Sequence, residues 1–227
     1  MSTLISPPVS THLAAIFADA AQNDQPLREK FRTVAPEEWH ALQKDRRFLF
    51  GNCAREAYLA VTPEFGRLLY LLAATRKARQ IVEFGTSFGI STIHLAAALR
   101  DNGGGKLITT EYEASKAERA RKNLDAAGLL DLVEIRVGNA LETLRTGIDD
   151  PIDLVLLDGP KDLYLPLLRL LESRLAPGAL IAADNAKDIE GPMAGYLAYV
   201  REPRNGYLSV HLPVDHGNEL SLRLTRG

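Results

Sequence analysis

Two apolar runs in this sequence each end on an aspartate, and an asparagine follows the second. They are IDLVLLD, residues 152–158, and GALIAAD, residues 178–184, with Asn185 next. If the runs are neighbouring parallel strands, Asp158 and Asp184 lie at one rim of a sheet. Two carboxylates and an amide oxygen, with room for water and substrate oxygens, suit an octahedral Mg²⁺ ion. The pattern predicts a divalent-metal site formed by Asp158, Asp184 and Asn185.

The histidines offer no competing metal site, because their spacing is not typical of zinc ligands. They are His12, His40, His94, His211 and His216. Lys161 stands three residues after Asp158, on the loop or first helical turn expected above the metal. Partial burial beside a dication lowers the pKa of a lysine, so that it can act as a general base. Alone, Lys161 would be interpreted as a surface residue.

The stretch VEFGTSFGIST, residues 82–92, predicts a loop that meets a ligand. Gly85 and Gly89 let the backbone approach closely, and the helix expected after them presents free N–H groups. A dinucleotide site would have glycine at position 87, which is serine, and Glu83 would repel a pyrophosphate. An acid at position 83 instead suits a cationic group, such as the ammonium of an amino acid.

Two further loops complete the ligand. Glu111 ends the run KLITTE, and a carboxylate there can accept hydrogen bonds from both hydroxyls of a ribose. The loop after the next run carries Asn139 and Ala140, whose backbone groups could bind an adenine edge. Sites for ammonium, ribose and adenine on successive strands predict S-adenosylmethionine as the cofactor.

A parallel sheet is needed to bring these loops together. Short β-rich runs alternate with segments of helical spacing, which favours a doubly wound α/β fold. The runs are residues 80–84, 106–111, 132–138, 152–158 and 178–184. Residues 206–213 and 218–225 then predict an antiparallel hairpin at the sheet edge. We predict a Rossmann-like, seven-stranded, mostly parallel sheet with helices before it.

Residues 1–76 are expected to be a helical extension and cap, and residues 77–227 the α/β core of the same domain. Helical spacing covers residues 12–20, 36–60 and 62–74, and Thr62-Pro63-Glu64 is a start signal for the last helix. Aromatic residues in this extension are expected in the core, although they could also cap an acceptor pocket or pack against a second subunit. They are Trp39, Phe48, Phe50 and Tyr58.

Composition limits the class of protein. The chain has 227 residues, of which 46% are hydrophobic and 25% charged, as in globular proteins. Its net charge of −2 gives no broad basic surface for nucleic acid. No signal-peptide pattern is present at the N-terminus, and no run approaches the ~20 apolar residues of a membrane span. The single cysteine, Cys53, fits a reducing compartment, so a cytoplasmic location is expected.

Several motifs resemble the catechol and caffeoyl-CoA O-methyltransferase family, class I S-adenosylmethionine enzymes that bind a divalent metal. LVLLDGPKDLYLPLL and PGALIAADNA resemble the metal region, and VEFGTSFGIST and VTPEFGRLL the cofactor region. The resemblance extends from about Tyr58 to the C-terminus. Its most specific element is the Asp158…Asp184-Asn185 pattern with Lys161 between.

The resemblance implies a role for each of these residues. Asp158, Asp184 and Asn185 would bind the metal. Lys161 would be the proton acceptor, and Asp158 would be the second catalytic residue. Val61 would close over the cofactor. The residues implied to contact the cofactor are Val61, Glu83, Gly85, Thr86, Ser91, Glu111, Ala140 and Asp158.

The expected reaction is methyl transfer from S-adenosylmethionine to a hydroxyl of a small catechol-like acceptor, with Mg²⁺. The hairpin offers His211, Asp215 and His216 but no clear acid to orient a catechol. Methylation of a hydroxyuridine in tRNA is the first alternative, with QKDRRF and RKAR as a local basic patch. A nicotinamide-dependent oxidoreductase is disfavoured by Ser87, and a non-catalytic binding protein by the complete set of polar groups. The sequence does not decide whether the protein forms a homodimer.

Overall fold

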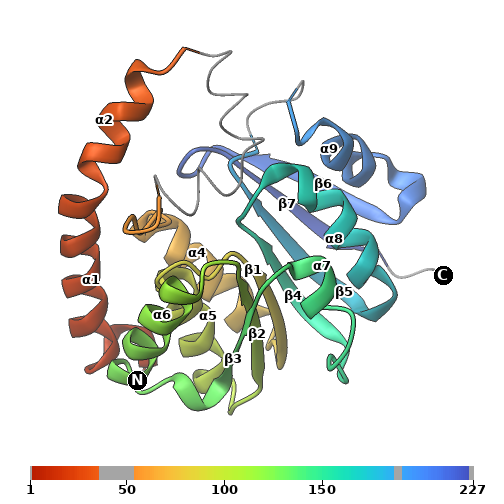
Figure 1. The fold of residues 1–227 in the computed structure, drawn as a ribbon. Coiled ribbons are helices and arrows are strands. Elements are labelled where there is room, and N and C mark those ends of the chain that lie inside the picture. The colour runs from red at the N-terminus through yellow and green to blue at the C-terminus, as the bar shows by residue number, and fades with distance from the viewer. Residues whose placement is uncertain (1, 36–53, 187–190, 225–227) are drawn as a thin grey trace.

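Within residues 2–35, 54–186 and 191–224, which the computed structural model describes, seven strands form one sheet at the centre of the molecule (Figure 1). Their order is β3-β2-β1-β4-β5-β7-β6. Strand β7 is antiparallel to both β5 and β6, and the other neighbouring strands are parallel. The predicted α/β sheet with a C-terminal hairpin at its edge is therefore confirmed. The strands are β1 (Gln80–Phe84), β2 (Lys106–Glu111), β3 (Val133–Val137), β4 (Ile152–Leu157), β5 (Leu175–Asp184), β6 (Tyr207–Leu212) and β7 (Asn218–Arg223).

Helices cover both faces of the sheet, as Figure 1 shows. One face carries α4, α5 and α6, with α1 outside them, and the other carries α7, α8 and α9. The α-helices of the described segments are α1 (Val9–Asn23), α2 (Gln25–Thr33), α4 (Pro63–Thr75), α5 (Ile90–Asp101), α6 (Ala114–Ala126), α7 (Ala140–Thr143), α8 (Tyr164–Leu171) and α9 (Ala194–Arg201).

The central strands are apolar throughout because both of their faces are buried. On β4, Leu154 and Leu156 pack into the core beneath α4 and α5, whereas Val155 and Leu157 pack into the core beneath α8 and α9. Successive side chains of a strand point to opposite faces, so a strand between two helical layers needs apolar residues at every position. This burial explains the continuous runs of the sequence.

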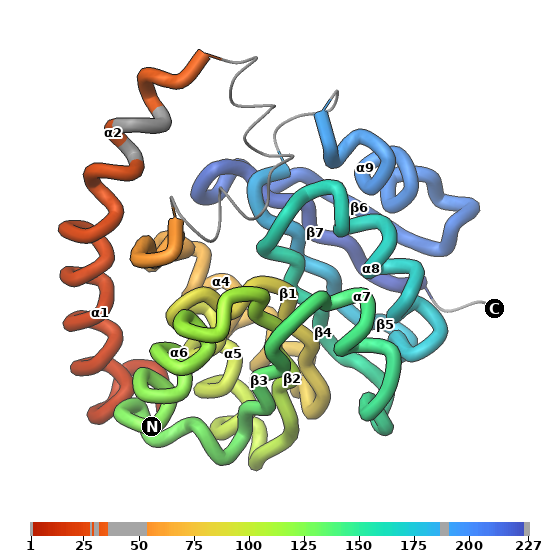
Figure 2. Tube along the Cα trace, in the orientation of Figure 1, coloured from red at the N-terminus to blue at the C-terminus, as the bar shows by residue number. Residues whose placement is uncertain are grey.

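The N-terminal region agrees with the sequence prediction only in part. The start signal of α4 is confirmed, since Thr62 Oγ1 accepts a 3.3 Å hydrogen bond from Phe65 N and Pro63 opens the helix. Helix α2 was not predicted, because Pro26 suggested a break, but proline is tolerated in the first helical turn. In Figure 2, α2 continues from α1 away from the sheet.

The predicted helix over residues 36–60 is wrong at its end, because residues 54–56 form a bend and a turn and residues 57–60 have no regular secondary structure. Most of that prediction lies outside the described residues, as do Trp39, His40, Phe48, Phe50 and Cys53. Tyr58 is described and buried, as expected. No helix in the described part of the chain is long and apolar enough to cross a membrane.

Candidate active site

The predicted site residues gather at the rim where the parallel strands end. Phe84, the last residue of β1, pairs with Leu157 of β4, which in turn pairs with Ala183 of β5. The residues that follow these positions, Gly85, Asp158 and Asp184, therefore emerge side by side. For Asp158 and Asp184, the sequence predicted this juxtaposition from the expectation that their strands are parallel neighbours.

Asp158 and Asp184 form a pair of carboxyl groups, of which Asp184 is buried and Asp158 half-buried. Burial, and then the charge of Asp184, raises the pKa of Asp158 well above its ordinary value, and burial raises that of Asp184. Asp184 Oδ1 is buried and has no hydrogen-bond partner among the described residues. A cation beside the unpaired oxygen would favour the charged form of both acids and offset the cost of burial.

The side chains at this point fit a divalent cation, except that Asn185 is oriented differently from the prediction. The Asn185 side chain donates from Nδ2 to Asp184 Oδ2, so its amide nitrogen rather than its oxygen faces the pair. In the described residues, no three His, Cys, Asp or Glu side chains form a metal cluster by themselves. Asp158, Asp184 and the amide of Asn185 are hence the groups that could hold the ion, with further oxygens coming from water or acceptor.

Lys161 lies beside this pair, at the start of a short 3-10 helix before α8. Its Nζ is 4.0 Å from Asp158 Oδ1 and donates a 2.6 Å hydrogen bond to Tyr164 Oη. Burial lowers the pKa of Lys161, an effect that the two carboxylates oppose. Tyr164 Oη itself donates to the backbone oxygen of Asp184 at 3.3 Å.

Tyr164 is a functional candidate that the sequence analysis missed. Its signal was its place three residues after Lys161, at the start of an otherwise leucine-rich helix, where its hydroxyl needs a buried partner. The ring packs edge-on against Phe84 and Tyr196, at centroid distances of 6.3 and 5.7 Å. These contacts fix the hydroxyl that positions Lys161.

Gly85 is required by the fold as well as by any ligand. Its φ is +104°, and a Cβ at this position would lie 1.9 Å from the backbone oxygen of Asp158. The loops after β1 and β4 touch at this point, where Asp158 N donates a 2.8 Å hydrogen bond to Phe84 O. The loop of residues 85–89, which we call the cofactor loop after its predicted role, is thus joined to the acidic pair through backbone contact.

Glu83 lies beneath the loop and is completely buried. Its Oε1 accepts from Ser91, and its Oε2 from Thr92 and Thr109, each at 2.6 Å. Thr86 Oγ1 joins the same group through Thr109, also at 2.6 Å. Burial raises the pKa of Glu83 to about 7. Oε1 keeps capacity for one more donor, which an ammonium could supply.

Glu111 ends β2 and holds the neighbouring loops. Its Oε2 accepts from Ser87 N at 2.8 Å, and its Oε1 from Glu113 N at 2.9 Å. A carboxylate oxygen has two lone pairs, so both oxygens can still accept from ribose hydroxyls. Ser87 has a left-handed φ of +46°, where glycine is usual, and its amide orients Glu111.

Two further residues implied to bind the cofactor flank this rim. Ala140 is buried and begins α7, which Asn139 caps by accepting from Leu141 N at 3.1 Å. Val61 is buried just before α4. It belongs to residues 57–62, a segment without regular secondary structure that we call the strap.

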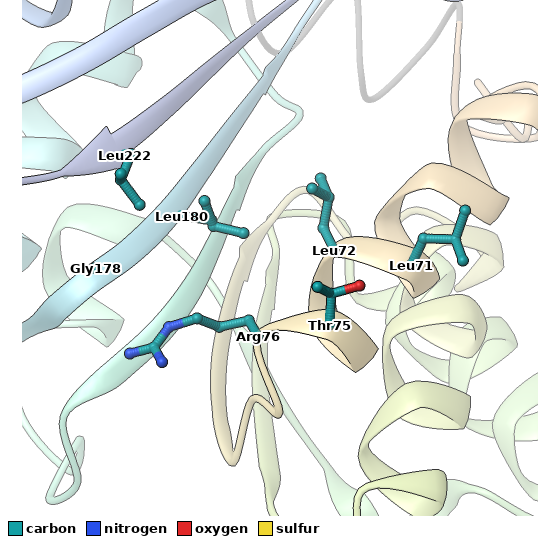
Figure 3. Close-up of a pocket in the computed structure, with 7 residues that line it drawn as sticks. All are labelled: Leu71, Leu72, Thr75, Arg76, Gly178, Leu180 and Leu222. Carbon is teal, nitrogen blue, oxygen red and sulfur yellow. The ribbon is translucent and has the colours of Figure 1, made fainter.

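A surface groove of about 330 Å³ lies away from these residues, between α4 and the strands β5 and β7 (Figure 3). Its lining is mostly apolar, and it includes none of the predicted site residues. The lining residues are Leu71, Leu72, Thr75, Arg76, Gly178, Leu180 and Leu222. Arg76 is already bonded to Pro177 O and Asp153, so the groove lacks the donors and acceptors of the rim.

Known proteins share this fold and part of this sequence. The methyltransferase domain family matches residues 82–186. The chain is 40% identical over 130 residues to a catechol O-methyltransferase of Niastella koreensis, covering 56% of this chain and 58% of that protein. It is 31% identical over 153 residues to the catechol O-methyltransferase of Sus scrofa, covering 65% of this chain and 80% of that protein. The chain thus spans little over half the length of the first relative.

Among solved structures, the O-methyltransferase TomG from Streptomyces achromogenes, determined in complex with SAM, superposes with a TM-score of 0.63. Its sequence is 29% identical, and the match covers 89% of this chain and 97% of TomG. The fold is therefore that of the class I S-adenosylmethionine-dependent methyltransferases. The match to the Sus scrofa protein, 80% of which the chain covers, shows that the chain belongs to the catechol O-methyltransferase family.

Proposed function

We propose that the protein is an S-adenosylmethionine-dependent O-methyltransferase acting on a small catechol-like acceptor with a divalent metal, Mg²⁺ being the expected ion. The observation that carries this proposal is the Asp158–Asp184 pair. Asp184 is buried and has one oxygen without a partner among the described residues, and Lys161 Nζ lies 4.0 Å from Asp158. An acidic pair of this kind suits a metal-chelating diol better than a simple alcohol. The names of the related proteins support an O-methyltransferase.

Bound cofactor and metal would supply an electrophilic methyl group on a sulfonium and a lowered pKa for a coordinated hydroxyl. Asp158, Asp184 and Asn185 would hold the metal. Glu83, Gly85, Thr86, Ser91, Glu111 and Ala140 would form the cofactor side of the rim, with Val61 above it. Each of these assignments is a proposal.

The chain's own residues would prepare the acceptor for attack. Lys161 in its neutral form would take the hydroxyl proton at Nζ, and burial favours that form. Tyr164 would hold Nζ in place through its 2.6 Å hydrogen bond. The oxygen left behind would attack the methyl carbon as the carbon–sulfur bond breaks, giving the methyl ether and S-adenosylhomocysteine.

The test is methyl transfer by the purified chain to catechols, caffeoyl derivatives and tRNA, each with Mg²⁺ and with excess chelator. We expect chelator-sensitive methylation of vicinal diols and none of monohydroxy analogues. Asp158→Asn should abolish turnover, whereas Asp150→Asn, at an exposed position outside the site, should leave it unchanged. Full activity of Asp158→Asn would refute the metal-assisted mechanism. Methylation of tRNA and of no small diol would show that the acceptor is RNA and not a catechol-like molecule.

A further inference from the structure

The strap is held in place by two buried charged residues that have no part in the proposed chemistry. They are Asp24, between α1 and α2, and Lys116, on α6. Only 2% of Asp24 and 3% of Lys116 is exposed. Charged residues are rarely buried so deeply unless their interactions repay the loss of hydration.

Asp24 binds the strap through both carboxylate oxygens. Oδ1 accepts a 2.6 Å hydrogen bond from Tyr58 N, and Oδ2 accepts one of 2.9 Å from Leu59 N. Leu59 has a left-handed φ of +48°, a conformation that is unfavourable for a leucine. The aspartate therefore holds the strap backbone in a shape that it would not keep alone.

Lys116 binds the strap and the cofactor loop together. Its Nζ donates to Ala57 O at 2.8 Å and to Ser87 Oγ at 3.3 Å. Ser87 Oγ in turn donates to Tyr58 O at 2.5 Å, and Ser87 N donates to Glu111. The contacts run without a gap from the strap to the carboxylate proposed to bind ribose.

Aromatic packing closes the same region. Tyr58 meets Phe88 edge-on at 4.5 Å between ring centroids, and Lys116 Nζ lies 5.4 Å from the centre of the Phe88 ring. The Tyr58 hydroxyl donates to Asp19 of α1. Helices α1 and α2 are thus connected to the cofactor loop through the strap.

We propose that Lys116 and Asp24 are positioning residues for the cofactor, holding the strap so that Val61 covers the site and Ser87 keeps Glu111 aligned. This inference rests on the proposed function and deepens it, because it gives the helices α1 and α2 a part in cofactor binding. The ligand concerned is the nucleoside and amino-acid moiety shared by S-adenosylmethionine and S-adenosylhomocysteine.

Calorimetric binding of S-adenosylhomocysteine tests the proposal without requiring turnover. Lys116→Met should raise the Kd about tenfold, because the Ala57 carbonyl and the Ser87 hydroxyl lose a buried donor. The KM for S-adenosylmethionine should rise similarly while kcat changes less than about twofold. Lys122→Met is the matched control, since Lys122 is exposed on the same helix, and its Kd should equal that of the wild type.

A second variant covers the case in which Lys116→Met fails to fold. Asp24→Asn keeps the shape and one acceptor oxygen but turns the other acceptor into a donor facing an N–H group. We expect about a tenfold rise in Kd and faster trypsin cleavage after Arg55, whose side chain is 54% exposed just before the strap. S-adenosylhomocysteine should slow this cleavage in the wild type more than in the variant.

The outcomes separate the two proposals. If a folded variant binds S-adenosylhomocysteine as the wild type does, with the same cleavage rate after Arg55, the positioning role is refuted while the proposed function stands. If the wild type itself does not bind S-adenosylhomocysteine, the proposed function fails and the positioning role fails with it.

Discussion

At the scale of single residues, the hydroxyl of Tyr164 connects Lys161 to the end of β5. Its hydroxyl accepts from Lys161 Nζ and donates to Asp184 O, so one group fixes both the proposed proton acceptor and the strand that carries a proposed metal ligand. A lysine side chain has several rotatable bonds, and this bond selects one of its orientations. Tyr164 is therefore expected to matter for turnover more than for binding.

Tyr164→Phe should lower kcat about tenfold, the effect of losing a hydrogen bond to a charged or proton-accepting group, with little change in the KM for S-adenosylmethionine. The pH dependence of kcat should shift as well, because Lys161 loses a partner. Tyr196→Phe is the control, since Tyr196 is also buried but lies on α9 behind Tyr164. Equal losses in the two variants would mean that Tyr164 acts only through packing.

His94 should make stability depend on pH. Burial lowers the pKa of His94 from 6.5 to about 4. Between these values the unfolded chain binds a proton that the folded chain does not, so stability falls as pH falls. The loss from pH 8 to pH 5 should be about 2 kcal/mol. Urea denaturation of the wild type and His94→Gln would show it as a difference in slope against pH.

Glu83 makes stability depend on pH in the opposite direction to His94. The His94→Gln variant is needed to isolate the contribution of His94. Glu83 has a raised pKa of about 7, so the folded chain binds a proton between pH 4.5 and 7 that the unfolded chain has released. Stability from Glu83 therefore falls as pH rises through this range. The two residues partly cancel in the wild type. Identical pH slopes for wild type and His94→Gln would show that His94 titrates normally.

The sequence predicted the positions of the rim residues better than their contacts. Asp158, Asp184 and Lys161 could be placed because strand ends meet in a parallel sheet. Ser87 and Lys116 could not, because their partners lie 29 and 59 residues away in the chain and their residue types are common on surfaces. Only the folded backbone shows that both lie against the strap.

The strap illustrates at the scale of elements why helical spacing can mislead. Residues 54–60 continue the apolar spacing of a helix, but the backbone groups of residues 57–59 are bonded to Asp24, Lys116 and Ser87. Long-range partners outweigh weak local propensity. The β-strands were predicted more accurately, because their burial on both faces leaves a continuous apolar run.

The start of α4 is the junction between the strap and the cofactor-binding core. Thr62 caps the helix with its hydroxyl, and its backbone N–H donates to Asp215 Oδ2 at 3.0 Å. Thr62→Ala should lower the free energy of unfolding by about 1 kcal/mol, the usual value of a cap. Chemical denaturation would measure it, with Thr62→Ser retaining most of the stability. A neutral Thr62→Ala would indicate that Asp215 alone holds this end.

At the scale of the whole molecule, we expect the acidic pair to lower stability in the absence of the proposed cation. Mg²⁺ at 100 times its Kd should raise the free energy of unfolding by about 2.7 kcal/mol. Asp184→Asn should lose this response and, without Mg²⁺, be no less stable than the wild type, because it removes a charge that repels Asp158. Thermal denaturation with and without Mg²⁺ would measure both effects.

Asp150→Asn is the control for this measurement, because Asp150 is exposed outside the site. It should respond to Mg²⁺ as the wild type does. An Mg²⁺ response that survives in Asp184→Asn would place the ion elsewhere in the protein.

The antiparallel course of β7 has a consequence for how this family can diversify. Asn218, at the start of β7, pairs with both Asp184 and Leu212, so the turn between β6 and β7 reaches the same rim as the ends of β4 and β5. A hairpin turn tolerates insertions and deletions that a parallel crossover would not, because its strands are already neighbours. Selection could therefore change the set of acceptors through this turn alone, leaving the cofactor half of the protein untouched.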